Sequence, residues 1–187
     1  MPGIDETRQF VPLKIAVLTV SDTRELTDDK SGNTLVERIR AAGHTLAERA
    51  IVKDEVKAIR QHVKAWIEDK FIDVIVTTGG TGFTGRDVTP EAVEPLFEKR
   101  MDGFSTMFTM ISVPKIGTSA IQTRATAGVA NSTYVFCLPG SPGACKDAWD
   151  EILVHQLDYR YRPCNFVEIL PRLDEHLRRP KARTQSG

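Results

Sequence analysis

Three short runs of apolar residues constrain the fold of this chain more than any other feature. They cover residues 14–20, 72–78 and 134–138, and each run is almost continuous. Strands that are buried on both faces of a sheet have this pattern, whereas strands with one exposed face alternate apolar and polar residues. Because burial on both faces requires helices on both sides, the runs predict a sheet enclosed between helices.

The segments between these runs have the signals of helices and of one further strand. Residues 31–33 can cap a helix that ends at Gly43, and Thr89 with Pro90 is a typical helix start. A loose alternation of apolar residues predicts a strand over residues 44–52. The predicted helices cover residues 34–42, 54–69, about 89–100, and a segment that begins at Ser141 and Pro142. Strands that alternate with helices indicate an α/β fold with a mostly parallel sheet.

Length and charge narrow the class of protein. The 187 residues are enough for one domain with its own core. Lys and Arg number 25, and Asp and Glu also number 25, so the formal net charge is zero. Proteins that mainly bind nucleic acid or anionic membranes carry an excess of basic residues, and we expect neither partner here.

The sequence also predicts a cytoplasmic, single-domain protein. It has no basic N-terminal region followed by an apolar run, and no apolar stretch reaches the ~18 residues of a membrane span. The cysteines, Cys137, Cys145 and Cys164, form no C-x-x-C pair, so we expect reduced thiols rather than a disulfide or zinc site. The predicted organisation is a flexible N-terminal arm at residues 1–11, one domain at residues 12–170, and a basic, disordered tail at residues 171–187.

Polar or glycine-rich segments follow each of the three buried runs. Ser21 and Asp22 follow the first, and a polar loop leads from them to Ser31. Residues 79–82, Gly-Gly-Thr-Gly, follow the second run, and residues 139–143, Pro-Gly-Ser-Pro-Gly, follow the third. Ligands of open α/β sheets bind beyond the carboxyl ends of the strands. These three segments therefore form the candidate binding site.

The segment after the second run predicts a phosphate site. Consecutive glycines let the backbone turn tightly and present amide groups to anionic oxygens. Thr78 and Thr81 add hydroxyl groups, and Arg86 adds a charge that can pair with phosphate. Asp87 would repel an anion unless it holds a metal or moves a proton. The spacing matches neither the P-loop nor the dinucleotide fingerprint, and a glycine-rich turn alone is more often only a tight turn, so the interpretation depends on these neighbours.

Two further features have a structural explanation as well as a functional one. Residues 139–143 place a helix N-terminus at a strand end, which can bind an anion or can simply cap the helix. Asp54 and Glu55 begin the predicted helix 54–69, where the helix dipole alone favours acidic residues.

Taken in order, these segments resemble the MoaB/MogA family of molybdenum cofactor biosynthesis proteins. The longest matching segment is Thr77-Thr-Gly-Gly-Thr-Gly-Phe-Thr-Gly-Arg-Asp-Val-Thr-Pro-Glu-Ala92. The other matching segments are Val20-Ser-Asp22, Ser31-Gly-Asn33, Arg124-Ala-Thr-Ala-Gly128 and Leu138-Pro-Gly-Ser-Pro-Gly143. The resemblance covers residues 13–166, and its ending, Arg162-Pro-Cys-Asn-Phe166, is most similar to the MoaB branch.

The resemblance implies a three-layer αβα fold with a mostly parallel central sheet, and a homotrimer or a hexamer of two trimers. It implies binding of molybdopterin, a pterin dithiolene with a terminal phosphate. In catalytic members it also implies adenylylation of that phosphate, with ATP as co-substrate and Mg²⁺ as cofactor. Contacts with other enzymes of molybdenum cofactor synthesis are a further implied partnership.

The resemblance also assigns roles to individual residues. Asp54 and Asp87 match the acids of adenylyl transfer and are the expected Mg²⁺ ligands. The expected ligand-binding positions are Ser21, Asp22, Ser31, Thr78, Gly79, Gly80, Thr81, Gly82, Gly140 and Ser141, together with Arg86 as the charge that pairs with phosphate. Thr106 and Thr109 depart from the family pattern by replacing a Glu and an Arg, so this chain lacks what those charges contribute to the pocket or to subunit contacts.

Three functions from different classes fit these observations. The first is a molybdopterin adenylyltransferase, which the presence of both Asp54 and Asp87 favours. The second is a non-catalytic molybdopterin binder or carrier with the same pocket, which the changes at Thr106 and Thr109 favour. The third is an interaction module, since the family fold also occurs inside larger scaffolding proteins; a single short domain makes this the least favoured of the three.

Overall fold

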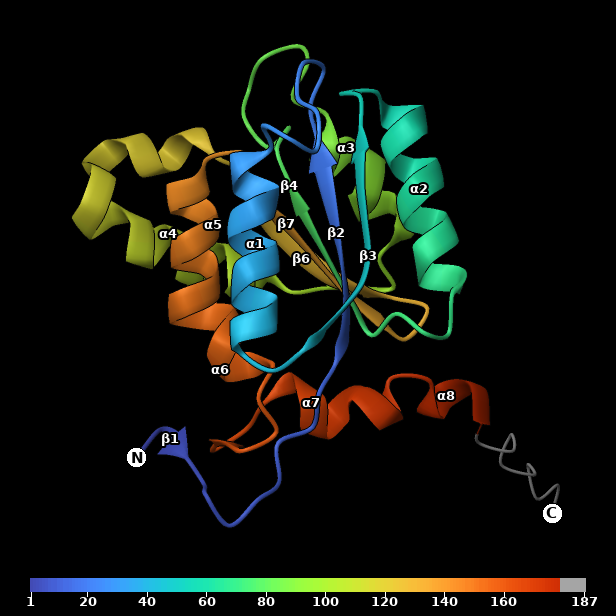
Figure 1. The fold of residues 1–187 in the computed structure, drawn as a ribbon, viewed down its shortest axis with the longest axis vertical. Helices are drawn as coiled ribbons and strands as arrows, with labels where there is room; N and C mark the ends of the chain where they lie inside the picture. Colours follow the sequence, from blue (N-terminus) through green and yellow to red (C-terminus); the bar gives the residue numbers. More distant parts are fainter. Residues whose placement is uncertain (179–187) are drawn as a thin grey trace, which may run out of the picture.

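Six strands form a central sheet in the order β3–β2–β4–β7–β6–β5 (Figure 1). The computed structural model describes residues 1–178. The strands are β2 (Lys14–Val20), β3 (Thr45–Val52), β4 (Val74–Thr78), β5 (Lys99–Arg100), β6 (Thr126–Ala130) and β7 (Thr133–Leu138). β2, β3, β4 and β7 are parallel, whereas β6 is antiparallel to both of its neighbours. The predicted mostly parallel sheet is confirmed; β5 and β6 were not predicted.

Helices cover both faces of this sheet (Figure 1). One face packs against α1 (Lys30–Ala41), α4 (Asp102–Ile116) and α5 (Pro142–Ala148), and the other against α2 (Val56–Glu68) and α3 (Thr89–Val93). Alternate residues of each strand point to opposite faces. Ile15 and Val17 of β2 accordingly join the first core, while Ala16 and Leu18 join the second. The expected three-layer αβα architecture is therefore present.

The starts of α1 and α2 and the end of α3 differ from the prediction by two residues or more. α2 begins at Val56, so Asp54 and Glu55 precede it. α1 begins at Lys30, and its N-cap is Asp29, whose carboxylate accepts a hydrogen bond from the Gly32 amide at 2.9 Å. The predicted cap at residues 31–33 therefore lies inside the helix. α3 ends at Val93 instead of near residue 100, because Pro95 has no amide hydrogen to continue the helical ladder. A single turn at Glu94–Leu96 and the short strand β5 follow.

The remaining elements are short. α5 widens at Trp149–Leu153 and continues into α6 (Val154–Gln156). One turn of helix at Gly117–Gln122 follows α4, and a turn at Leu170–Arg172 joins α7 (Phe166–Ile169) to the segment before α8 (Glu175–Arg178). No helix in residues 1–178 is long and apolar enough to cross a membrane. Cys137, Cys145 and Cys164 are free thiols.

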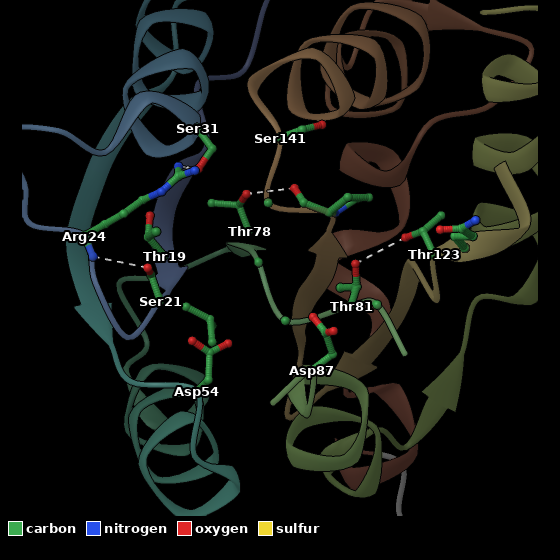
Figure 2. A pocket seen from close by; sticks show the side chains of 17 residues that line it. Thr19, Ser21, Arg24, Ser31, Asp54, Thr78, Thr81, Asp87, Thr123 and Ser141 are labelled. Carbon is green, nitrogen blue, oxygen red and sulfur yellow. Dashed lines mark hydrogen bonds between the residues drawn. The ribbon is translucent and has the colours of Figure 1, made fainter. Parts of the chain in front are cut away.

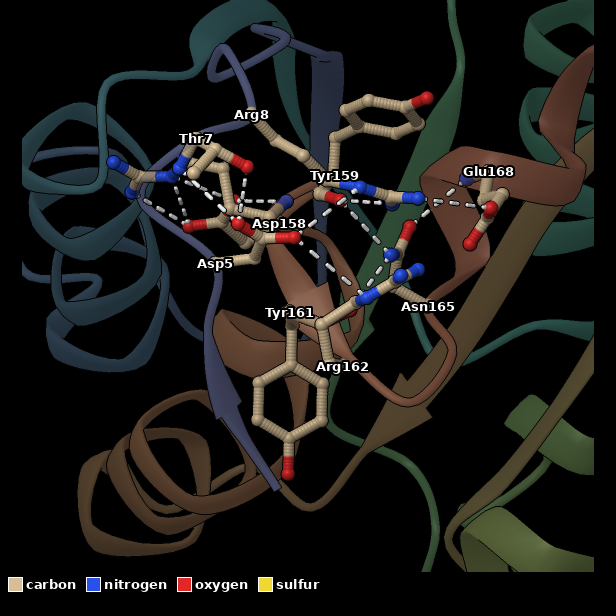
Figure 3. A network of polar contacts seen from close by, with 10 residues as sticks. Asp5, Thr7, Arg8, Asp158, Tyr159, Tyr161, Arg162, Asn165 and Glu168 are labelled. Carbon is tan, nitrogen blue, oxygen red and sulfur yellow. Dashed lines mark hydrogen bonds and ion pairs between the residues drawn. The ribbon is translucent and has the colours of Figure 1, made fainter. Parts of the chain in front are cut away.

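The N-terminal segment, for which the sequence predicted a flexible arm, is tied to the C-terminal part of the domain (Figure 3). β1 (Gly3–Ile4) pairs with β8 (Tyr161–Arg162). The Arg8 guanidinium donates to the Tyr159 carbonyl oxygen at 3.1 Å and lies 4.7 Å from the centre of the Tyr159 ring. At the other end of the chain, the predicted disordered tail includes α8, and its residues 179–187 lie outside the described residues.

Candidate functional site

A pocket of about 380 Å³ lies beyond the carboxyl ends of β2, β4 and β7 (Figure 2). Three loops surround it because the carboxyl ends of parallel strands meet at one edge of a sheet. The predicted residues that line it are Ser21, Ser31, Asp54, Thr78, Gly79, Gly80, Thr81, Gly82, Asp87, Gly140 and Ser141. The lining residues that sequence reasoning missed are Thr19, Val20, Arg24, Gln122, Thr123 and Pro139.

The glycines after β4 are required by the shape of the pocket floor. Gly79 and Gly80 have φ angles of +105° and +66°, in the left-handed region that side chains rarely adopt. A Cβ atom on Gly79 would lie 2.3 Å from the Val20 carbonyl oxygen, and one on Gly80 would lie 2.4 Å from Thr89 Oγ1. Thr89 fixes this turn, because its hydroxyl donates to the Gly79 carbonyl oxygen at 2.8 Å. No other residue type fits here without displacing the backbone.

Arg124 stabilises the segment that follows these glycines, from Thr81 to Asp87. Its Nε donates to the Gly82 carbonyl oxygen and its Nη2 to the Asp87 carbonyl oxygen, both at 2.8 Å. Its backbone amide donates to the Thr81 carbonyl oxygen at 2.8 Å, and its guanidinium also pairs with Glu91. The sequence marked the segment that begins at Arg124 without giving this residue a role. The structure shows that it joins both ends of the segment between Gly82 and Asp87.

The two acidic residues of the pocket differ in their surroundings. The Asp87 carboxylate accepts hydrogen bonds from the amide and hydroxyl of Thr84, at 2.9 and 2.6 Å. Partial burial alone would raise the pKa of Asp87, but the pKa is lowered by these hydrogen bonds together with the Gly82 amide and the charge of Arg124. Burial and the nearby charge of Asp22 raise the pKa of Asp54, and the charge of Arg86 offsets part of this rise. Asp87 is therefore the more strongly ionised of the two.

The opposite side of the pocket is organised by Asp29, a fully buried carboxylate that sequence reasoning missed. It accepts hydrogen bonds from the hydroxyls of Thr19 and Ser31, at 2.7 and 3.2 Å, and pairs with Arg49 at 3.0 Å. Burial raises the pKa of Asp29, but the hydrogen bonds from Thr19, the Gly32 amide and Arg49, with the charge of Arg49, lower it further than burial raises it. Asp29 therefore fixes the two pocket hydroxyls from behind. Asp29 could have been identified from the sequence as a polar residue shortly before a predicted helix.

Two predicted ligand-binding residues lie outside the pocket lining. Arg86 donates from Nε and Nη2 to the Asp22 carboxylate at 2.9 and 2.7 Å, and both side chains are exposed. Arg24, by contrast, lines the pocket and donates from Nη1 to Ser31 Oγ at 3.3 Å. The arginine that lines the pocket is therefore Arg24, to which sequence reasoning assigned no role, and not Arg86. Thr106 and Thr109 are exposed on α4 and also lie outside the lining.

The third loop completes the pocket wall. Ser141 is the N-cap of α5, as predicted, and its Oγ accepts a hydrogen bond from the Ala144 amide at 3.2 Å. Gly140 passes close to the glycine-rich loop, where an added Cβ would lie 3.2 Å from Gly79 Cα. Thr123 reaches the pocket from the turn after α4 and lies 3.2 Å from Thr81, hydroxyl to hydroxyl. No local pattern near Thr123 could have marked it.

The donor set of the pocket fits a divalent cation only together with a ligand. Within residues 1–178, no group of three or more His, Cys, Asp or Glu side chains is arranged to hold a metal ion. Asp54 and Asp87 are two carboxylates on one side of the pocket (Figure 2). Mg²⁺ is typically bound by one or two carboxylates, with phosphate oxygens and water as its other ligands. The two aspartates therefore suit a Mg²⁺ ion that arrives with a phosphorylated ligand.

Comparisons with known proteins agree with the resemblance seen in the sequence. Residues 16–159 match the family model described as a probable molybdopterin binding domain. Molybdenum cofactor biosynthesis protein B of Escherichia coli K12 is 49% identical over 158 residues, which cover 84% of this chain and 93% of that protein. The Bacillus subtilis protein of the same name is 43% identical over 163 residues, 86% and 96% of the two chains. A crystal structure of a molybdenum cofactor biosynthesis protein B superposes with a TM-score of 0.78 at 40% identity, covering 80% of this chain and 94% of that one.

Proposed function

Because this chain belongs to the MoaB/MogA family of molybdenum cofactor biosynthesis proteins, whose domain is the molybdopterin-binding domain, we propose that its pocket binds molybdopterin and adenylylates the terminal phosphate of that ligand with ATP. The observation that carries this proposal is the pairing of a glycine-shaped phosphate cradle with two carboxylates, Asp54 and Asp87, in one pocket. A binding protein needs the cradle, whereas two acids beside an anion site are costly unless they take part in chemistry.

The cradle suits phosphate because it is made of backbone and hydroxyl groups. The turn at Gly79 and Gly80 has no side chains between the backbone and the pocket. The Gly79 amide donates to the Leu138 carbonyl oxygen at 3.0 Å, so the amides that follow it in the turn are the candidate donors to anionic oxygens. Such amides need no rearrangement when charge develops on those oxygens. Ser21 and Ser141 add hydroxyl groups from the two neighbouring loops.

The proposed reaction transfers an adenylyl group. An oxygen of the molybdopterin phosphate attacks the α-phosphorus of ATP and forms a new phosphoanhydride bond. The bond from that phosphorus to the bridging oxygen of the β-phosphate breaks, and pyrophosphate leaves with the electron pair. Such transfers depend on positioning and charge neutralisation more than on covalent help from the protein. The rigid turn at Gly79 and Gly80 would supply the positioning.

Asp54 and Asp87 would hold Mg²⁺ through their carboxylates. The ion supplies charge neutralisation of the phosphate oxygens when bound. Arg124 fixes the backbone of Asp87, and Thr84 fixes its carboxylate, so this ligand is held in place before substrates bind. The backbone amide of Asp54 donates to Asp22 at 3.2 Å, which ties the second acid to the loop after β2.

The test is incubation of the purified protein with molybdopterin and Mg-ATP. The expected products are adenylylated molybdopterin and one equivalent of pyrophosphate, detected by chromatography. Omitting Mg²⁺ should remove the product but not the binding of molybdopterin. Binding without any Mg-ATP-dependent product would favour the non-catalytic carrier, and failure to bind molybdopterin would reject both functions.

We also propose that the chain forms a symmetric homotrimer or a hexamer of two trimers. The support in this structure is an apolar surface on α4 and the turn after it. Its exposed residues are Met107, Met110, Val113, Ile116 and Ile121, and the last is 73% exposed. Exposed apolar surfaces of this kind commonly mark subunit contacts.

Light scattering with chromatography tests the assembly. The wild-type protein should elute as a trimer or hexamer at micromolar concentration, and Met110→Glu combined with Ile121→Glu should give monomers. Phe71→Glu is the matched control, because Phe71 is 70% exposed but lies outside this surface, before β4. A monomeric wild-type protein would reject the assembly.

A further inference from the structure

The pocket lining carries opposite charges on its two sides. Arg24 lies beside Ser31 on the side of α1, and Asp54 and Asp87 lie on the other side (Figure 2). Among the described residues, Arg24 is the one basic side chain that lines this pocket. A ligand with separate regions of charge would therefore bind in one direction only.

Among residues 1–178, no carboxylate pairs with Arg24 within 4 Å of its guanidinium nitrogens. Its guanidinium donates instead to a neutral group, Ser31 Oγ. The buried acid nearby, Asp29, is already engaged by Arg49, Thr19 and the start of α1. An anion can therefore pair with Arg24 without breaking an existing ion pair.

Arg24 is also held in position. Its backbone amide donates to Ser21 Oγ at 3.2 Å, and its guanidinium donates to a hydroxyl, Ser31 Oγ, which in turn donates to the buried carboxylate of Asp29. This chain of hydrogen bonds runs from a fully buried group to the pocket surface. It orients the guanidinium before any ligand is bound, which reduces the entropy that binding costs.

Arg86 lacks these properties. Its Nε and Nη2 donate to the Asp22 carboxylate, and this exposed pair lies outside the pocket lining. A ligand phosphate would have to displace Asp22 from this edge of the guanidinium, or share a charge that Asp22 already pairs. Position and pairing therefore both favour Arg24 over Arg86.

We infer that Arg24 binds a phosphate group of the ligand and directs that group to the α1 side of the pocket. A guanidinium can make two parallel hydrogen bonds to phosphate oxygens, which an ammonium group cannot match. The inference rests on the proposed function only in taking this pocket as the ligand site. The phosphate is either the terminal phosphate of molybdopterin or part of the ATP triphosphate.

Affinity measurements with three probes distinguish these sources. Molybdopterin, ATP without metal, and inorganic pyrophosphate are each titrated by calorimetry into the wild-type protein and into Arg24→Gln and Arg24→Lys. We expect Arg24→Gln to weaken the probe whose phosphate it binds by about 10- to 100-fold, the range for a hydrogen bond to a charged group. Arg24→Lys keeps the charge but cannot make the two parallel hydrogen bonds of a guanidinium. Its affinity for that probe should therefore lie between those of the wild type and Arg24→Gln. A loss restricted to molybdopterin or to ATP identifies the source.

Two control variants separate this role from general effects. Arg38→Gln removes an arginine of α1 that pairs with Asp150 and lies outside the pocket lining, and it should leave all three affinities unchanged. Arg86→Gln tests the competing assignment and should change each affinity by less than about threefold, as expected for an exposed pair. Circular dichroism confirms that each variant is folded.

The outcomes distinguish this inference from the proposed function. Equal affinities of the wild type and Arg24→Gln for all probes would overturn the inference while leaving molybdopterin binding intact. A large loss in Arg24→Gln also overturns it if Arg86→Gln shows the same loss. A wild type that binds pyrophosphate through Arg24 but does not bind molybdopterin would support the inference and reject the proposed function.

Discussion

The two ends of the sheet are built from the same strands but differ in whether their polar groups are open to a ligand or paired within the protein (Figure 1). At the carboxyl ends, loops leave glycine backbone, hydroxyls and the unpaired charge of Arg24 open to the pocket. At the amino ends, several polar groups have hydrogen-bond partners inside the protein. His44 Nδ1, for example, accepts a hydrogen bond from the Leu13 amide at 3.1 Å. Substitutions should therefore act mainly on ligand binding at one end and mainly on folding stability at the other.

The largest expected effect is at Gly80. In Gly80→Val, the new Cβ would lie 2.4 Å from Thr89 Oγ1 on a backbone with a φ of +66°, so the turn must move. We expect molybdopterin binding to fall by ~10²-fold or more, with about 1–3 kcal/mol of lost stability and a folded chain. Titration of molybdopterin measures the first effect, and urea unfolding measures the second.

Gly85→Val is the matched control for Gly80→Val, because an added Cβ there meets no atom within 4 Å. It should leave both binding and stability almost unchanged. Normal binding by Gly80→Val would show that the ligand does not use this turn. Complete unfolding of Gly80→Val would contradict the prediction that substitutions at the carboxyl ends act mainly on ligand binding and those at the amino ends mainly on stability.

Asp87→Asn should act on turnover rather than on binding. Asparagine keeps an oxygen that can accept from Thr84, but it loses the charge that Mg²⁺ requires. The kcat of adenylylation should fall roughly 10²-fold or more, as for other lost charge-stabilising groups. Molybdopterin affinity should stay constant or rise slightly, since an acid beside a phosphate is removed.

Steady-state kinetics and titration together measure the Asp87→Asn effect. Asp102→Asn, an exposed acid on α4, is the control and should keep full turnover. Full activity in Asp87→Asn would exclude Asp87 from catalysis. A loss of affinity equal to the loss of kcat would show that this end of the sheet does not separate binding from chemistry.

At the amino end, His44 should make stability depend on pH. Its ring is 6% exposed, and burial lowers its pKa from 6.5 to about 4. Between these values the unfolded chain binds the extra proton, so the free energy of unfolding should fall as the pH decreases from about 6.5 to about 4. The expected fall is about 2–3 kcal/mol, and all of this stability is present above pH 6.5.

Urea unfolding at a series of pH values, for the wild type and for His44→Gln, isolates this contribution. The glutamine side chain would keep an acceptor for the Leu13 amide but has no proton to gain, so the variant should show a flatter dependence in that pH range. Molybdopterin affinity at pH 7 should be the same in both proteins. Parallel pH curves for the two proteins would contradict the assignment to His44.

The smallest expected effect is at Arg8, which ties the N-terminal segment to the amino end. Arg8→Met keeps an apolar chain but loses the hydrogen bond to the Tyr159 carbonyl, the contact with the Tyr159 ring and the ion pair with Glu168. These contacts together should contribute about 0.5–1 kcal/mol. Hydrogen exchange should accelerate at β1 and stay unchanged at β4. Unchanged exchange at β1 would mean that its pairing with β8 suffices.

The same contrast explains which elements could be predicted. β2, β4 and β7 were predicted because their apolar runs are local and continuous. β6 was missed because Thr126–Ala130 consists mainly of small residues, with Gly128 at its centre. The structure gives the reason for that glycine, since an added Cβ would lie 2.4 Å from the Phe97 ring. A requirement that comes from a distant side chain leaves no periodic pattern in the strand itself.

The sequence by itself determined the layered fold, the glycine-rich turn and the cap at Ser141, because each depends on residues close together in the chain. Backbone angles, helix starts and burial on both faces are all local properties. The N-terminal contacts of Arg8 were not foreseen for the opposite reason: its partners lie about 150 residues away, at Tyr159 and Glu168.

Only the tertiary structure decided which charges face the ligand. Arg24 and Arg86 both follow strands at the carboxyl end of the sheet, and nothing in their local sequence distinguishes them. The distinction comes from Asp22, which lies 64 positions from Arg86 and pairs with its guanidinium. Asp29 pairs with Arg49, and among residues 1–178 no carboxylate pairs with Arg24. Electrostatic pairing acts through space between residues far apart in the sequence, so the availability of a charge is a property of the folded chain.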